Sequence, residues 1–200
     1  KMFIPANSEC SSLVIPYGGT IDSSLEVNSE LSEKHPFLKK EYFLSISRSL
    51  EDNKIDELCS IFQDSKKTLV LISNFSKSEY GKKVLIKYSN RSNIYLIDGL
   101  YNKPELDLVR RKCLAYIHTH TLCGTAPSLV EMIVSGRPIL SIDIPQNRHT
   151  LKSEGYFFKT FDDLKSHLEI NNSMEAYIPN KDIRKSYSWL NTVKKYESIY

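Results

Sequence analysis

The segment from Ala115 to Ile142 reads AYIHTHTLCGTAPSLVEMIVSGRPILSI, and it decides the fold of this 200-residue chain. Its first residues form a short apolar, β-branched run that predicts a strand, and the glycine, proline and small hydroxyl residues that follow predict a loop. A run with the apolar spacing of a helix comes next, and we expect Ser128 to cap its start and Gly136 to end it. PILSI then predicts a second buried strand, so the segment is expected to form a strand–helix–strand unit.

Similar units are expected on both sides of this segment. Helices are predicted at 55–62, 77–88 and 161–170, with a further helix opened by Pro104, and apolar strands at 42–46, 68–73, 94–97 and 154–158. This regular alternation predicts an α/β fold with a parallel sheet.

The loop that follows the strand at Ala115 is the expected ligand site. Ligands of doubly wound sheets bind beyond the carboxyl ends of the strands. The free N–H groups at the start of the following helix favour an anion there. Glu131 lies about one turn inside that helix, and a carboxylate in this position is well placed to accept hydrogen bonds from a ribose diol.

The loop and helix resemble the donor-site signature of family 4 retaining glycosyltransferases, which have the GT-B fold. The sequence HTHTLCGTAPSLVE at 118–131 is similar to H-G-H-S-V-G-G-T-N-P-S-L-L-E of the O-antigen and capsule subgroup, which includes rhamnosyltransferase-like and N-acetylgalactosaminyltransferase enzymes. Glu131 matches the second glutamate of the family's E-x7-E motif. Cys123 stands in place of the first glutamate, which usually holds donor sugar hydroxyls. The resemblance implies a Rossmann-like three-layer parallel sheet that forms the C-terminal half of a GT-B fold.

The resemblance also implies donor-binding residues outside this loop. Arg48 matches an arginine that clamps the donor diphosphate, a task that suits the planar guanidinium, and Lys54 lies one position beyond the lysine of the family. The turn after the third strand lies against the nucleobase in the family, which implies this role for Gly99 and Leu100. The expected donor-binding residues are Arg48, Lys54, Gly99, Leu100, Gly124, Thr125, Ser128, Leu129 and Glu131.

The rest of the chain is expected to surround one nucleotide-sugar-binding domain at 41–178. We expect 1–40 to be a linker with a lead-in strand at 12–21, and 179–200 to be a single crossover helix, although a basic amphipathic helix on its own domain or on a membrane is an alternative. The polar residues 143–149 are expected to form a loop. Because the chain begins at Lys1 without an initiator methionine, we expect a fragment of a longer protein whose N-terminal domain is missing.

Composition excludes several classes of protein. The formal charge of +3 is too small to indicate nucleic-acid binding, and no apolar run approaches the roughly 18 residues that span a membrane. The four cysteines are far apart and lack a C-x-x-C pair, which favours reduced thiols in the cytoplasm. The motifs G-x-G-x-x-G and G-x4-G-K-[ST] are both absent, which argues against an NAD site and a P-loop.

His118 and His120 lie two positions apart at the end of a strand and so share one face. A metal site is one interpretation. The sequence offers no obvious third ligand, so we expect no metal and no other cofactor besides the nucleotide-sugar substrate. A nucleophilic pair of Cys123 and His120 is a second interpretation, although cysteine is usually a small apolar residue.

The resemblance implies retaining transfer of a hexose or N-acetylhexosamine, from a UDP-sugar, to a lipid-linked acceptor in O-antigen or capsule synthesis. Arg48 and Glu131 are the expected catalytic residues, since Arg48 and the helix start would neutralise the leaving diphosphate. The protein would act in the cytoplasm, and a peripheral position on the inner face of the membrane is an alternative. A dTDP-rhamnose-dependent transferase and a sugar-nucleotide epimerase of the same fold are alternatives. A receiver-like module is disfavoured, because YFLSIS and TLVLIS end without the acidic residues that receivers need.

Overall fold

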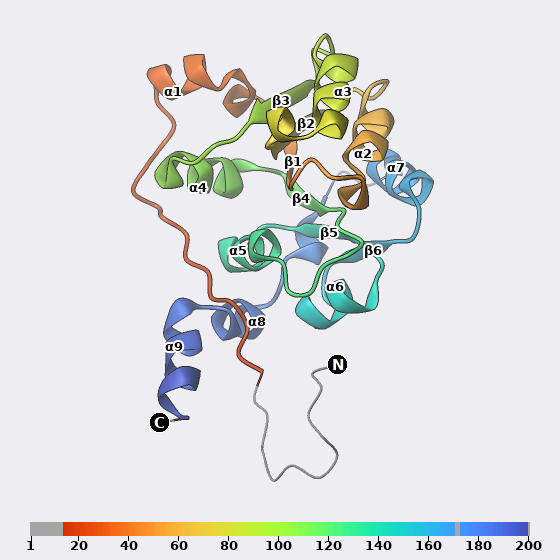
Figure 1. The fold of residues 1–200 in the computed structure, drawn as a ribbon. Coiled ribbons are helices and arrows are strands. Elements are labelled where there is room, and N and C mark those ends of the chain that lie inside the picture. The colour runs from red at the N-terminus through yellow and green to blue at the C-terminus, as the bar shows by residue number, and fades with distance from the viewer. Residues whose placement is uncertain (1–13, 171–172, 200) are drawn as a thin grey trace.

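The computed structural model describes residues 14–170 and 173–199. Six strands in this part of the chain form one parallel sheet (Figure 1), and their order across the sheet is β3-β2-β1-β4-β5-β6. The strands are β1 (Tyr42–Ile46), β2 (Thr68–Ser73), β3 (Ile94–Asp98), β4 (Ala115–His118), β5 (Ile139–Ile142) and β6 (Tyr156–Phe158).

The strand order reverses between β1 and β4. The chain runs outward from β1 through β2 to β3, then returns to place β4 on the other side of β1 and continues outward to β6. Loops that leave neighbouring strands at such a reversal run in opposite directions, which leaves a crevice beyond their carboxyl ends. This crevice is where the candidate site lies.

Helices cover both faces of the sheet and give three layers (Figure 1). Alternate strand residues face opposite layers, so that Phe43 packs on one side while Tyr42 and Leu44 pack on the other. The helices on the Phe43 side are α2 (Ile55–Phe62), α3 (Glu79–Tyr88) and α7 (Phe161–Ile170), and those on the other side are α4 (Lys103–Lys112), α5 (Pro127–Ser135) and α8 (Lys181–Ser186).

Further helices and turns complete the described chain. None of its helices combines the length and apolar character needed to cross a bilayer. The further helices are α1 (Ser29–Lys34), α6 (Pro145–Thr150) and α9 (Trp189–Glu197), and the 3₁₀ turns are η1 (Pro36–Lys39), η2 (Glu51–Asn53), η3 (Phe75–Lys77) and η4 (Glu175–Tyr177).

The predicted fold class is confirmed, and most element bounds agree within two residues. The central helix ends as expected at Gly136, whose φ of 70° is left-handed and suits glycine. The predicted cap at Ser128 is wrong. Ala126 is the N-cap residue, and Pro127 occupies the first turn, where its missing N–H has no partner to lose.

The expected lead-in strand at 12–21 does not form in its described portion. Residues 12 and 13 lie outside the described residues, and from Val14 onward the segment makes only an isolated bridge between Gly19 and Ser188. Gly19 donates its N–H to the carbonyl of Tyr187 at 2.7 Å. The segment therefore runs beside the C-terminal helices and not along an edge of the sheet.

The polar segment 143–149 is helical where a loop was predicted. It contains most of α6, which begins at Pro145, a residue suited to the first turn of a helix. Asn147 is buried and donates to the carbonyls of His120 and Ile142 at 3.3 and 3.2 Å. These tertiary hydrogen bonds hold the helix on the sheet although its sequence is polar.

The single C-terminal helix expected from residue 180 onward is also wrong, because it divides into α8 and α9. Tyr187 is buried at the break, and its hydroxyl donates to the carbonyl of Thr150 at 2.9 Å. Ser188 then caps α9 by accepting from the N–H of Asn191. A buried anchor followed at once by a strong N-cap ends one helix and begins another.

Candidate functional site

A cavity of about 620 Å³ lies at the strand reversal. This volume is within the range of small-molecule sites, which is roughly 300–1,000 Å³. Its walls come from the carboxyl ends of β1, β2 and β3, from the loop after β4 and from the first turn of α5. The predicted residues that line it are Arg48, Gly99, Leu100, Thr125 and Ser128.

Arg48 lies at the exposed end of β1 and lines the cavity. Its loop is fixed by two hydrogen bonds, from the Asn53 amide to the Arg48 carbonyl at 2.8 Å and from the Ser49 N–H to Asn74 Oδ1 at 3.1 Å. Among the described residues no carboxylate forms an ion pair with the guanidinium of Arg48. This cation is therefore available to an anionic ligand.

Lys54 does not line the cavity. It occupies the left-handed position between η2 and α2, with a φ of 54°, and its Nζ lies 3.1 Å from the carboxylate of Glu57. The structure thus brings Arg48 to the cavity and directs Lys54 along the outside of α2.

The first turn of α5 forms one wall of the cavity. Thr125, Ala126, Pro127 and Ser128 all line it, so the amino end of the helix faces the cavity. Leu129 does not reach the cavity, because its side chain is fully buried in the core beneath the helix.

Gly124 lies beside the main cavity. It lines a neighbouring hollow of about 450 Å³ that Thr125 also borders and that α6 closes on the other side. Apart from Gly124 itself and its two chain neighbours, no atom of the described residues lies within 4 Å of the point that a Cβ at Gly124 would occupy. Thr125 therefore borders both the main cavity and the neighbouring hollow.

Glu131 is held by an ion pair and does not line the cavity. Its carboxylate accepts a hydrogen bond from Arg110, which also donates to Asp107 at 2.8 Å. Asp107 is fully buried and accepts from Lys103 and from the N–H of Asp22 as well. Burial raises the pKa of Asp107, but these hydrogen bonds outweigh burial and leave the pKa below its ordinary value. Glu131 keeps 32% of its side chain exposed at the end of this charged chain.

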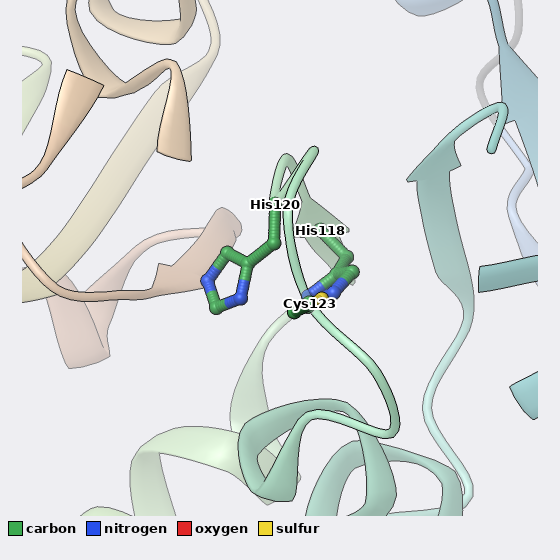
Figure 2. A group of neighbouring side chains, drawn as sticks. All are labelled: His118, His120 and Cys123. Atoms are coloured by element: carbon green, nitrogen blue, oxygen red, sulfur yellow. The ribbon is translucent and has the colours of Figure 1, made fainter. Parts of the chain in front are cut away.

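His118, His120 and Cys123 form a cluster beside the cavity (Figure 2). One nitrogen of each histidine and the cysteine sulfur all lie within 4.8 Å of one another. Burial lowers the pKa of His118 well below its ordinary value, and His120 adds to this effect. Burial also lowers the pKa of His120, against the nearby Asp52 carboxylate, and raises the pKa of the Cys123 thiol. All three groups are therefore neutral near pH 7.

Sequence reasoning missed several parts of the site. It found no third ligand near the two histidines, whereas the structure supplies Cys123 from the loop. It also missed the lining residues Tyr17, Asn74 and Tyr101. Asn74 directly follows β2, so its place at a strand end was a usable signal, whereas Tyr17 arrives from a distant segment that carries no local pattern for this site.

Comparisons with known proteins identify the fold. No protein-family model and no curated protein matches the chain. Among solved structures, the chain is similar to the OtsA apo structure, with a TM-score of 0.68 and 11% identity over 88% of this chain and 47% of that one. It is also similar to TarM, with a TM-score of 0.60 and 18% identity over 80% of this chain and 35% of that one.

A third similar structure is the pneumococcal O-GlcNAc transferase GtfA in complex with UDP and GlcNAc. The TM-score is 0.60 and the identity 15%, over 92% of this chain and 38% of that one. The chain thus spans less than half the length of each of these three proteins. The fold is the Rossmann-like C-terminal half of a GT-B architecture.

Proposed function

We propose that this chain is the donor-binding half of a glycosyltransferase and that its cavity binds a nucleotide sugar. One observation carries the proposal. An arginine that has no carboxylate partner among the described residues, at the end of β1, lines the same cavity at the strand reversal as the amino end of α5. Both features favour a diphosphate, the arginine through charge-assisted hydrogen bonds and the helix through its free N–H groups. Two solved structures with this fold are described with UDP and GlcNAc and with UDP-2-fluoro glucose.

The cavity suggests how the donor lies. We propose that the nucleobase binds beside Gly99 and Leu100 after β3, and that the diphosphate binds between Arg48 and the turn that includes Thr125 and Ser128. The sugar would then extend past Thr125 toward the neighbouring hollow, which Gly124 leaves unobstructed. The open backbone at Gly124 and the absence of the usual glutamate at position 123 leave room for a sugar that is held differently from that of most family members.

Glu131 is proposed to bind the ribose diol. It lies three residues beyond Ser128, which lines the cavity, and positions three apart share one side of a helix. A carboxylate has about four acceptor positions, so the bond from Arg110 leaves others for ribose hydroxyls. Arg110 would hold the carboxylate in one orientation. Lys54 and Leu129, which do not line the cavity, would act only indirectly.

The reaction that we propose is retaining transfer of a hexose or N-acetylhexosamine, from a UDP-sugar, to a lipid-linked acceptor in O-antigen or capsule synthesis. The resemblance of 118–131 to enzymes of that subgroup supports this proposal. Arg48 and the start of α5 would neutralise the leaving diphosphate, and this electrostatic help is typically the largest catalytic contribution. A second domain would supply the acceptor site, and the enzyme would work at the cytoplasmic face of the membrane. dTDP-rhamnose is the alternative donor.

Calorimetry with UDP, dTDP, GDP and NAD tests the proposal on the 200-residue chain. We expect UDP to bind with 1:1 stoichiometry and more tightly than GDP or NAD, with dTDP closest to it. Tightest binding to NAD, or binding of none of the four, would contradict the donor-site proposal. Hydrolysis or epimerisation of the sugar nucleotide by a longer protein, without transfer to an added acceptor, would favour an epimerase instead.

A further inference from the structure

The loop that leaves β4 presents three side chains with ligand atoms for a soft metal ion. His118 ends the strand and is fully buried, whereas His120 and Cys123 lie on the loop and line the cavity (Figure 2). Thr119 and Thr121 alternate with the histidines and bond to carbonyls of the η2 turn. These bonds fix the loop, so that the two histidines lie on one side of it, and the sulfur of Cys123 lies on the same side.

The hydrogen bonds of His118 leave one lone pair without a partner. Its Nδ1 lies 3.4 Å from the Tyr116 hydroxyl oxygen, and that hydroxyl donates its only proton to the carbonyl of Ile46 at 3.2 Å. The Tyr116 oxygen must therefore accept from Nδ1–H, which places the lone pair of the imidazole on Nε2. Within the described chain, Nε2 of His118 and Nε2 of His120 have no hydrogen-bond partner. Buried polar atoms without partners are rare, and an ion is one of the explanations for them.

We propose that His118, His120 and Cys123 bind one zinc ion, with the fourth coordination position open toward the cavity. Zinc takes imidazole nitrogen at about 2.0–2.1 Å and thiolate sulfur at about 2.3 Å in tetrahedral geometry, which needs ligand atoms roughly 3.5 Å apart. The present spread of up to 4.8 Å requires a contraction of about 1 Å. The loop has room for this shift because Gly124, next to the cysteine, has open space around it.

The surroundings of the cluster suit an ion with an open site. Three protein ligands and one free position are the arrangement of catalytic zinc centres, and the Tyr116 hydroxyl orients His118 as outer-shell partners of zinc ligands do. Asp52 and Arg48 both act electrostatically on Cys123, in opposite directions. On binding, Cys123 would lose its proton to solvent and leave a net charge of +1 on the ion and its thiolate.

Metal titration of the 200-residue chain tests this proposal. The protein would carry Cys10→Ser, because the other cysteines outside the cluster, Cys59 and Cys113, are buried. After removal of metal with a chelator, we expect one equivalent of Co²⁺ to give thiolate-to-cobalt charge-transfer absorption that one equivalent of Zn²⁺ abolishes. Competition with a chromophoric chelator would then give the zinc affinity.

Variants assign the ligands. We expect Cys123→Ser to remove the charge-transfer band, and His120→Gln and Cys123→Ser each to weaken zinc binding at least as much as the roughly 10–100-fold typical of outer-shell changes. Tyr116→Phe should weaken binding by about 10–100-fold while the charge-transfer band remains, because it only positions His118. His149→Gln, which changes an exposed histidine outside the cluster, is the matched control and should bind zinc like the parent.

Thermal unfolding of each variant without metal would verify that the fold is intact. Absence of the charge-transfer band at one equivalent of cobalt would overturn the proposal. Zinc affinities of His120→Gln and Cys123→Ser within twofold of the parent would overturn it as well. All titrations are made without nucleotide, so their outcome is independent of UDP binding.

Discussion

Arg48 offers the sharpest test of the proposed donor site. Its guanidinium is exposed at the end of β1, lines the cavity and has no carboxylate partner among the described residues. Replacing it by glutamine therefore leaves no acidic group without its counter-ion. We expect Arg48→Gln to change the free energy of unfolding by less than about 0.5 kcal/mol, as is usual for surface substitutions.

The effect on UDP binding should be much larger. A hydrogen bond to a charged group contributes about 1.5–3 kcal/mol, and each 1.4 kcal/mol is a factor of ten in Kd. Because Arg48 is exposed to solvent, we expect the lower part of this range, a loss of roughly 10–30-fold. Arg48→Lys should fall between the parent and Arg48→Gln, since it keeps the charge and loses the planar fork that pairs two phosphate oxygens.

Arg91→Gln is the matched control. Arg91 is an exposed arginine just before β3, at the opposite end of the sheet from the cavity, and its guanidinium donates to Gln63 at 3.5 Å. The same net charge is removed in both variants, so a purely long-range effect would weaken UDP binding equally. Calorimetry at low and high salt would measure the affinities of the parent and the three variants for UDP, and we expect the loss in Arg48→Gln to shrink as salt rises.

Two results would refute this reasoning. If Arg48→Gln bound UDP within twofold of the parent, the arginine would not contact the diphosphate. If Arg91→Gln lost as much affinity as Arg48→Gln, the attraction would belong to the charge of the whole protein and not to the cavity.

Three further predictions follow from the same site. Glu131→Gln should weaken UDP binding by at least about tenfold, as expected for charge-assisted bonds to a ribose diol, and unchanged affinity in calorimetry would make Glu131 a residue of the helix surface. Asp107→Asn should lower the free energy of unfolding by about 2–3 kcal/mol. This is less than the 3–5 kcal/mol typical of a broken buried pair, because Arg110 keeps its ion pair with Glu131. Since folding lowers the pKa of Asp107, its contribution is complete above the unfolded value of about 4 and is lost as the pH falls through the folded pKa. Urea unfolding at several pH values should therefore show the deficit of Asp107→Asn shrinking in acid, and a deficit independent of pH would contradict this assignment. Finally, the 200-residue chain should transfer no labelled sugar from UDP-N-acetylhexosamine or dTDP-rhamnose to an undecaprenyl-type acceptor, because a closed two-domain cleft positions donor and acceptor; turnover by this chain alone would mean that its active site is complete.

The sheet could be predicted because its strands are buried on both faces. Such strands appear as short, uninterrupted apolar runs, and the runs at 42–46 and 68–73 became β1 and β2 with the predicted bounds. The helix at 55–62 was equally clear, since Ile55, Leu58 and Phe62 recur at helical spacing and are all buried. In these places one local pattern is sufficient to determine both the element and its direction of burial.

The errors arose where distant groups decide the local structure. Helix α6 depends on hydrogen bonds that Asn147 makes to a loop and a strand, and the break before α9 depends on Tyr187 reaching Thr150, 37 positions away. Neither partner can be identified from the polar sequence itself. The pairing of Glu131 with Arg110 is of the same kind, because the two residues come from different helices and only the packed fold brings them together.

One half of the loop after β4 could be predicted from the sequence, and the other half could not. Its second half opens α5, and a glycine, small residues and a helix start have a recognisable order, so Thr125 and Ser128 were found at the cavity from the sequence. Its first half leaves the sheet while still buried, where the direction of each side chain depends on bonds to the η2 turn. A cysteine three positions beyond the second histidine has no fixed orientation in a flexible peptide. In the folded chain β1 and β4 are neighbours, so η2 lies against the loop and fixes the orientation of the cysteine. The ligands of the proposed zinc ion therefore lie in the same wall of the cavity as the residues proposed to hold the diphosphate.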